Sequence, residues 1–152
     1  MVLQPGDPAP DVEAPNQHGE ATAPSFEPPT VLYFYPEDGT PGCTTEAEQF
    51  VRERASYEDA GVAIYGVSTD TVDAHRAFAD EQGVWFDLLA DPEGDVAEAF
   101  GVELREGRAL RTTFVLADSA VHRVYGGVDP DGHARDVMLD LLDDGLVELE
   151  GV

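Results

Sequence analysis

Short runs of branched and aromatic residues alternate along this chain with segments of helical periodicity, and this alternation limits the possible folds more than any other feature. Residues 31–35 form one such uninterrupted run, and residues 62–67 form a second. Continuous apolar runs of this length are typical of strands buried on both faces of a sheet. A helical stretch follows each run, so the chain is expected to adopt an α/β fold, with a central mixed β-sheet flanked by helices.

Glycine and proline positions place the other elements. Prolines recur throughout residues 1–30, which excludes a long helix there and predicts an extended or hairpin-forming segment. Glycines at 61 and 83 are expected to end helices over 43–60 and 71–82. Further expected elements are a short strand at 88–89, a helix at 92–100, a hairpin of 113–117 with 121–125, and a helix at 132–142. The acidic residues 143–152 are expected to form a loose tail.

A chain of 152 residues is expected to form a single domain, 1–152, with one real core. Its apolar runs are far shorter than the ~20 residues needed to cross a bilayer, so no membrane partner is expected. The first residues lack the basic start and apolar stretch of a secretory signal. A single cysteine cannot form an internal disulfide. These observations together favour a cytoplasmic protein.

The charge of the chain is strongly unbalanced. It carries 32 acidic residues against 8 basic ones, a net charge of −24. Such a chain would repel phosphates, which argues against a nucleic-acid partner. Molar salt screens self-repulsion by shortening the Debye length to about 3 Å. We therefore hypothesise a high-salt cytoplasm, as in halophilic archaea; the alternative is a merely acidic, soluble protein.

The single cysteine, Cys43, lies where a predicted strand turns through Gly39, Pro41 and Gly42 into a helix. The first helical turn has unpaired N–H groups and the positive end of the helix dipole, both of which stabilise a thiolate. Cysteine has an ordinary pKa of about 8.5, and such surroundings can bring it to roughly 3.5–7.5. The alternative is an inert cysteine that fills space in the core, as lone cysteines commonly do. A nearby hydroxyl, Thr40, favours the reactive interpretation.

Pro36, Thr40 and Cys43 fill the three defined positions of a pattern that resembles the peroxiredoxin active-site motif. The longer strings 34–36 and 40–47 are similar to the bacterioferritin-comigratory (PrxQ) branch of that family. The resemblance also covers residues 6–11, 65–68 and 111–114, and so extends over about residues 3–143. It implies a thioredoxin-like fold and a thiol-dependent peroxidase without cofactor or metal.

Specific roles follow from the resemblance. It implies that Cys43 attacks a hydroperoxide and becomes a sulfenic acid, that Thr40 hydrogen-bonds the peroxide, and that Pro36 shields the site from water. The matching arginine is Arg111, whose guanidinium would stabilise charge developing on the leaving oxygen. The alternative for Arg111 is an ordinary surface ion pair. The substrate-binding residues would be Thr40, Gly42, Cys43 and Arg111.

Glu46 has two possible roles, as a hydrogen-bond acceptor in the site or as a first-turn carboxylate that complements the helix dipole. The sequence leaves both open. The four histidines show no metal-ligand spacing, and we interpret them as surface residues.

The chain departs from the PrxQ pattern in one important way. Many members carry a second, resolving cysteine five residues after the first, and here that position is Glu48. An external thiol, or Cys43 of another chain, would have to reduce the sulfenic acid. The expected reductant is a thioredoxin-like or glutaredoxin-like protein or a small thiol. The substrate class is hydrogen peroxide and organic hydroperoxides, and the chain could be a monomer or a homodimer.

Two rival enzymes fail on their required residues. A disulfide oxidoreductase needs a second cysteine, and a cysteine phosphatase needs an arginine where Gln49 stands. A peroxide-sensing thiol switch or binding module survives as an alternative, because sensing and turnover share their first chemical step.

Overall fold

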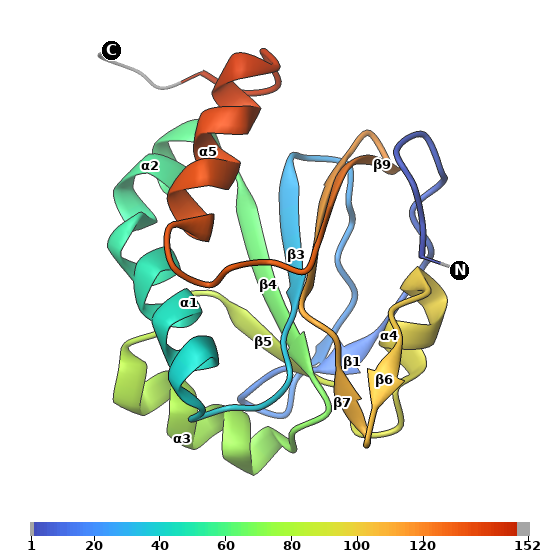
Figure 1. Ribbon diagram of the computed structural model, residues 1–152, viewed down its shortest axis with the longest axis vertical. Helices are drawn as coiled ribbons and strands as arrows, with labels where there is room; N and C mark the ends of the chain where they lie inside the picture. Colours follow the sequence, from blue (N-terminus) through green and yellow to red (C-terminus); the bar gives the residue numbers. More distant parts are fainter. Residues whose placement is uncertain (1, 149–152) are drawn as a thin grey trace.

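A five-stranded mixed sheet lies at the centre of the computed structural model, which describes residues 2–148 (Figure 1). The spatial order is β5-β4-β3-β8-β9. β4 runs parallel to β3 and β5, whereas β8 is antiparallel to β3 and β9. The strands are β3 (Thr30–Phe34), β4 (Ala63–Ser68), β5 (Asp87–Ala90), β8 (Thr112–Ala117) and β9 (Ala120–Gly126). The predicted α/β fold with a mixed sheet is confirmed.

Helices cover both faces of this sheet, and every residue of β3 is therefore buried. Val31, Tyr33 and Tyr35 face one core together with residues of α1, α2, α3 and α5. Leu32 and Phe34 face the other core, together with α4. The helices are α1 (Pro41–Arg52), α2 (Arg54–Ala60), α3 (Val72–Gln82), α4 (Asp95–Phe100) and α5 (His133–Asp143).

Local signals explain several element ends. The side chain of Thr71 accepts a hydrogen bond from Ala74 N and caps α3, and Gly83 ends that helix in the left-handed conformation. The expected helix 43–60 is instead two helices that meet at Glu53. Periodicity could not reveal this break, because Phe50 and Tyr57 on either side of it belong to the same core.

Two small hairpins complete the fold. β1 (Ala14–Pro15) pairs with β2 (Ala21–Thr22), as expected of the proline-rich lead-in. β6 (Leu104–Arg105) pairs with β7 (Arg108–Ala109), a hairpin that our sequence analysis missed. None of the helices over residues 2–148 is long and apolar enough to span a membrane.

The segment expected as an acidic tail, 143–152, begins inside α5. Asp144 then pairs with Arg123, and Val147 is buried. Residues 149–152 lie outside the described residues.

Candidate active site

Cys43 is the third residue of α1, at the edge of the sheet where β3 and β4 end. Thr40 is the N-cap residue with extended backbone, and Pro41 opens the helix. Proline needs no hydrogen-bond acceptor at this position, and its fixed φ suits the first turn. Cys43 therefore belongs to the first turn, whose N–H groups have no preceding helical carbonyl to bind.

Arg111 reaches the sulfur from the neighbouring strand. Thr112 pairs with Phe34, so the preceding residue, Arg111, stands beside the loop that leads to α1. Its Nη2 lies 3.4 Å from Cys43 Sγ. Only 16% of the arginine side chain is exposed. Its guanidinium is thus held against the sulfur instead of pairing in open solvent, and the surface ion-pair interpretation is wrong.

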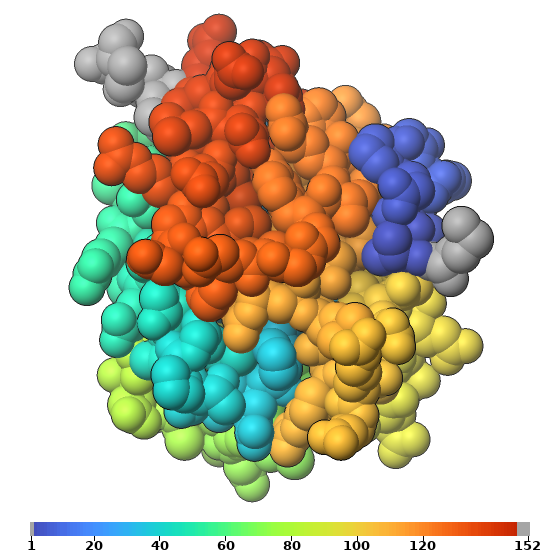
Figure 2. Space-filling model, viewed as in Figure 1, coloured from blue at the N-terminus to red at the C-terminus, as the bar shows by residue number. Residues whose placement is uncertain are grey.

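The sulfur itself is covered, with 1% of Cys43 exposed. The segment leading into α5 lies against the start of α1 (Figure 2). A Cβ atom placed on Gly42 would stand 3.1 Å from Arg111 Nη2 and 3.5 Å from Pro130 Cγ. Glycine at position 42 therefore permits this close approach. Cys43 is as buried as an inert core cysteine would be, but its sulfur contacts a cation, Arg111.

Glu46 accepts a hydrogen bond from the same guanidinium, with Nη1 2.8 Å from Oε1. Its side chain is fully buried, and Oε2 has no hydrogen-bond partner among the described residues. Burial raises the pKa of Glu46 from 4.5 to about 7, although Arg111 opposes the shift. Of the two roles open for Glu46, the structure shows the hydrogen-bond acceptor.

Thr40 and Pro36 lie in the loop between β3 and α1, and both are half-buried. The Thr40 hydroxyl donates to Glu37 O at 2.9 Å and does not cap the helix with its side chain. A hydroxyl has one donor and two acceptor lone pairs, so its oxygen can still accept a hydrogen bond.

Two of the four histidines are not surface residues, and that interpretation was wrong for them. His133 is buried at the start of α5, where Nε2 lies 2.9 Å from Thr113 Oγ1. Burial lowers the pKa of His133 to about 4, so its imidazole is neutral at neutral pH. His75 is also fully buried. His18 is exposed and His122 half-exposed.

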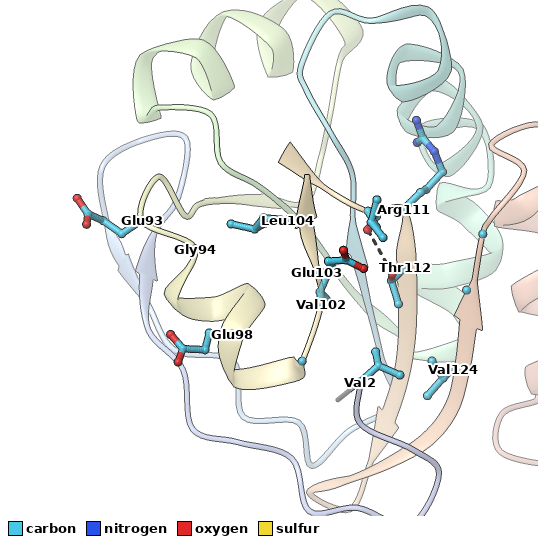
Figure 3. Close-up of a pocket in the computed structure, with 14 residues that line it drawn as sticks. Val2, Glu93, Gly94, Glu98, Val102, Glu103, Leu104, Arg111, Thr112 and Val124 are labelled. Atoms are coloured by element: carbon cyan, nitrogen blue, oxygen red, sulfur yellow. Dashed lines mark hydrogen bonds between the residues drawn. The ribbon is translucent and has the colours of Figure 1, made fainter. Parts of the chain in front are cut away.

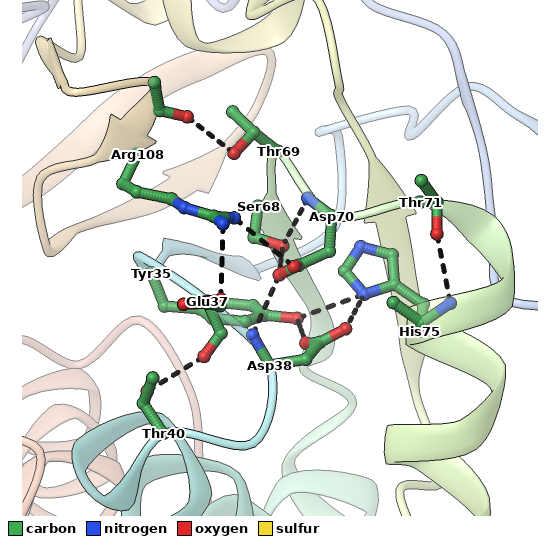
Figure 4. Close-up of polar contacts among 12 residues, drawn as sticks. Tyr35, Glu37, Asp38, Thr40, Ser68, Thr69, Asp70, Thr71, His75 and Arg108 are labelled. Carbon is green, nitrogen blue, oxygen red and sulfur yellow. Dashed lines mark hydrogen bonds and ion pairs between the residues drawn. The ribbon is translucent and has the colours of Figure 1, made fainter.

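His75, Asp38 and Asp70 bring potential metal-ligating atoms within 4.8 Å of one another. Those atoms already have partners within the protein. His75 Nδ1 lies 2.6 Å from Asp38 Oδ2, and Asp70 Oδ2 accepts from Asp38 N and Ser68 Oγ. Figure 4 shows this cluster beside the loop that contains Thr40. Internal hydrogen bonding accounts for the arrangement.

A hollow of about 960 Å³ lies on the other side of Arg111, between α4, β6 and the edge of β9. Its apolar lining includes Val2, Leu104 and Val124, and Cys43 is not among its lining residues. Figure 3 shows the guanidinium of Arg111 directed out of this hollow, toward α1. The sulfur of Cys43 therefore does not lie in this hollow.

Comparisons with known proteins agree with this geometry. The AhpC/TSA family profile matches residues 5–124. A putative peroxiredoxin Bcp of Coxiella burnetii is 35% identical over 150 residues, covering 91% of this chain and 98% of its own. The peroxiredoxin Bcp of Escherichia coli is 35% identical over 140 residues, covering 91% and 86%.

Solved structures show the same similarity. Peroxidoxin BcpB from Mycobacterium tuberculosis superposes with a TM-score of 0.86 at 34% identity, covering 93% of this chain and 97% of its own. A bacterioferritin comigratory protein of Xanthomonas campestris, described for alkyl peroxide reduction, gives 0.83 at 30% identity, covering 95% and 98%. The fold is thus thioredoxin-like, and the chain belongs to the AhpC/TSA family of peroxiredoxins, in its Bcp (PrxQ) branch of thiol-dependent peroxidases.

Proposed function

We propose that this chain reduces hydrogen peroxide and organic hydroperoxides in a one-cysteine cycle. One observation carries the proposal: the guanidinium of Arg111 lies 3.4 Å from the sulfur of the single cysteine. This contact places a fixed cation beside the sulfur that must act as nucleophile and beside the negative charge that develops as the O–O bond breaks.

In the oxidative half of the cycle, the Cys43 thiolate attacks one peroxide oxygen. An S–O bond forms and the O–O bond breaks, so the sulfur loses two electrons and becomes a sulfenic acid. The other oxygen leaves as hydroxide or alkoxide and takes a proton from water. Arg111 and the first-turn N–H groups of Gly42 and Cys43 stabilise the charge on that leaving oxygen.

Thr40 orients the substrate in this proposal. Its hydroxyl hydrogen is engaged by Glu37 O, which supports a role as acceptor for the peroxide O–H. Pro36, which is half-buried in the same loop, limits the access of water in this proposal. Glu46 holds the second nitrogen of Arg111 and so fixes the direction of the guanidinium.

The reductive half needs a sulfur from outside the chain, because the position five residues after Cys43 is Glu48. A thiol attacks the sulfenic sulfur to give a mixed disulfide and water, and a second thiol then releases the Cys43 thiolate. The reductant is a small thiol or a thioredoxin-like or glutaredoxin-like protein. Because only 1% of Cys43 is exposed, the start of α1 must open for this step.

Intact-protein mass spectrometry after one equivalent of peroxide tests the first half. We expect the gain of one oxygen atom in the wild type and none in Cys43→Ser. Oxidation elsewhere than at Cys43, or no faster than that of a free thiol, would contradict the peroxidase proposal.

Steady-state peroxide consumption tests the second half, with each class of reductant supplied in turn. We expect sustained turnover with at least one of them. Stoichiometric oxidation of Cys43 without turnover would favour a peroxide-sensing thiol switch, which uses the same first step.

A further inference from the structure

The carboxylate of Asp38 connects the loop between β3 and α1 to His75 of α3. Asp38 lies two residues before Thr40, and its side chain is only 7% exposed. Its Oδ2 lies 2.6 Å from Nδ1 of His75, whose side chain is fully buried in α3. Tyr35, directly after β3, donates its hydroxyl to the other oxygen, Oδ1, at 2.6 Å (Figure 4).

The hydrogen bonds of His75 fix where its hydrogens lie. Nε2 is 3.0 Å from Leu89 O, which can only accept, so Nε2 carries a hydrogen. Nδ1 faces the Asp38 carboxylate, and the hydroxyl hydrogen of Tyr35 is already engaged by Oδ1. One further hydrogen must therefore lie between Nδ1 and Oδ2. Two lone pairs would otherwise face each other at 2.6 Å in the protein interior.

The main chain of Asp38 is held as well. Its N–H donates to Asp70 Oδ2 at 2.8 Å, and Asp70 also accepts from Ser68 Oγ. Arg108 of the β6–β7 hairpin approaches both Asp70 and Glu37, at 3.5 and 3.2 Å. The loop is thus anchored at Asp38 through its side chain, to α3, and through its backbone, to the segment that follows β4.

From these contacts we propose that His75 is a positioning residue for the peroxidase site. Through Asp38 it fixes the loop 36–40, and so sets the placement of the Thr40 hydroxyl relative to Cys43. The proposal rests on the proposed role of Thr40 as acceptor for the peroxide. Without His75, a buried carboxylate would lose its partner, and the loop would have to move so that water could reach Asp38.

Two disruptive variants and one conservative variant test this role. His75→Phe keeps an aromatic ring but removes both hydrogen bonds, and Asp38→Ala removes the carboxylate. Asp38→Asn should preserve the contact, because its amide can donate to Nδ1 of a neutral imidazole and still accept from Tyr35. His122→Phe is the matched control, since His122 also pairs with a carboxylate, Asp144, away from the sulfur.

Two rates are measured on each folded protein: oxidation of Cys43 by hydrogen peroxide, and its alkylation by iodoacetamide. Alkylation also needs the thiolate but makes no use of Thr40. We expect the ratio of oxidation to alkylation to fall roughly tenfold to a hundredfold in His75→Phe and Asp38→Ala, because small misplacements cost that much. Asp38→Asn and His122→Phe should keep the wild-type ratio.

A wild-type ratio in the two disruptive variants would overturn the proposal, even if their melting temperatures fall. An equally low ratio of oxidation to alkylation in Asp38→Asn would overturn the argument that the hydrogen bond between residue 38 and His75 positions the loop. If His75→Phe does not fold, the two Asp38 variants decide the question. Failure of the proposed function is distinguishable, since it would appear as slow oxidation of the wild type itself.

Discussion

Glu46 combines a cost in stability with a functional contact. Its pKa is raised by burial to about 7 in the folded protein, against 4.5 for the ordinary side chain. Below pH 4.5 the carboxyl is protonated whether the chain is folded or unfolded, so it costs nothing. As the pH rises from 4.5 toward 7, Glu46 ionises in the unfolded chain but not in the folded one, so the free energy of unfolding falls. Above pH 7 both states are ionised, and the loss of stability stays constant at on the order of 3 kcal/mol.

Glu46→Gln should therefore stabilise the protein at pH 8 but not at pH 4.5, as measured by urea unfolding across this range. The same variant should oxidise about tenfold more slowly with peroxide, because a neutral amide holds Arg111 less firmly than a carboxylate. Glu48→Gln, at an exposed position on the same helix, is the control and should change neither the pH dependence of stability nor the oxidation rate. An equal gain in stability at every pH would contradict the argument.

The sequence indicated the residues proposed to react more clearly than the residues that hold them in place. A motif at a helix start singled out Cys43 and Thr40, and the resemblance to the peroxiredoxin family singled out Arg111, which the structure places against Cys43. The burial of His75 was missed because its partner, Asp38, lies 37 positions away in the chain. Histidine occurs both inside and outside proteins, so the residue type gave no signal by itself.

At the scale of elements, the β8–β9 turn is strained. Ala117 pairs with Ala120, so the loop has two residues, and both Asp118 and Ser119 have positive φ, at 54° and 60°. Turns of this kind favour glycine, because a Cβ atom is disfavoured at positive φ. Ser119→Gly should raise the free energy of unfolding by roughly 0.5–1 kcal/mol.

Thermal unfolding checks this expectation, with Ser119→Ala as the control that retains a Cβ atom. The backbone bonds of Ser119 to Phe26 and Ala9 remain available to glycine. The turn lies at the opposite end of β8 from Arg111, so the peroxidase rate should not change. Equal melting temperatures for the glycine and alanine variants would show that strain at this φ is negligible.

Turn chemistry also explains what was missed among the elements. The β6–β7 hairpin turns at Glu106 and Gly107, both with positive φ. Glutamate in place of asparagine or aspartate at the first position weakens the usual hairpin signal. The long strands were predictable because burial on both faces leaves continuous apolar runs, whereas strands of two residues leave no periodicity to detect.

Over the whole molecule, two of the eight basic residues contact the candidate site or the loop that leads to it. Arg111 contacts Cys43 and Glu46, and Arg108 contacts the loop that precedes α1 through Glu37. The chain nevertheless has a net charge of −24, and salt screens the repulsion among its carboxylates.

The same charge leads to a prediction about stability. Repulsion among carboxylates acts over about 10 Å at 0.1 M salt but only about 3 Å at 1 M. Raising potassium chloride from 0.1 M to molar concentrations should therefore raise the melting temperature by on the order of 10 °C, corresponding to roughly 3 kcal/mol. Circular dichroism across a salt series measures this shift.

A variant with fewer surface charges separates charge screening from a general effect of salt on apolar burial. Glu48→Gln, Asp59→Asn and Glu81→Gln, combined, neutralise exposed carboxylates without touching the core. Screening predicts that this variant melts higher than the wild type at low salt and that the difference shrinks as salt rises. If the two proteins instead respond in parallel, or if neither responds, repulsion between carboxylates does not limit the stability of this fold.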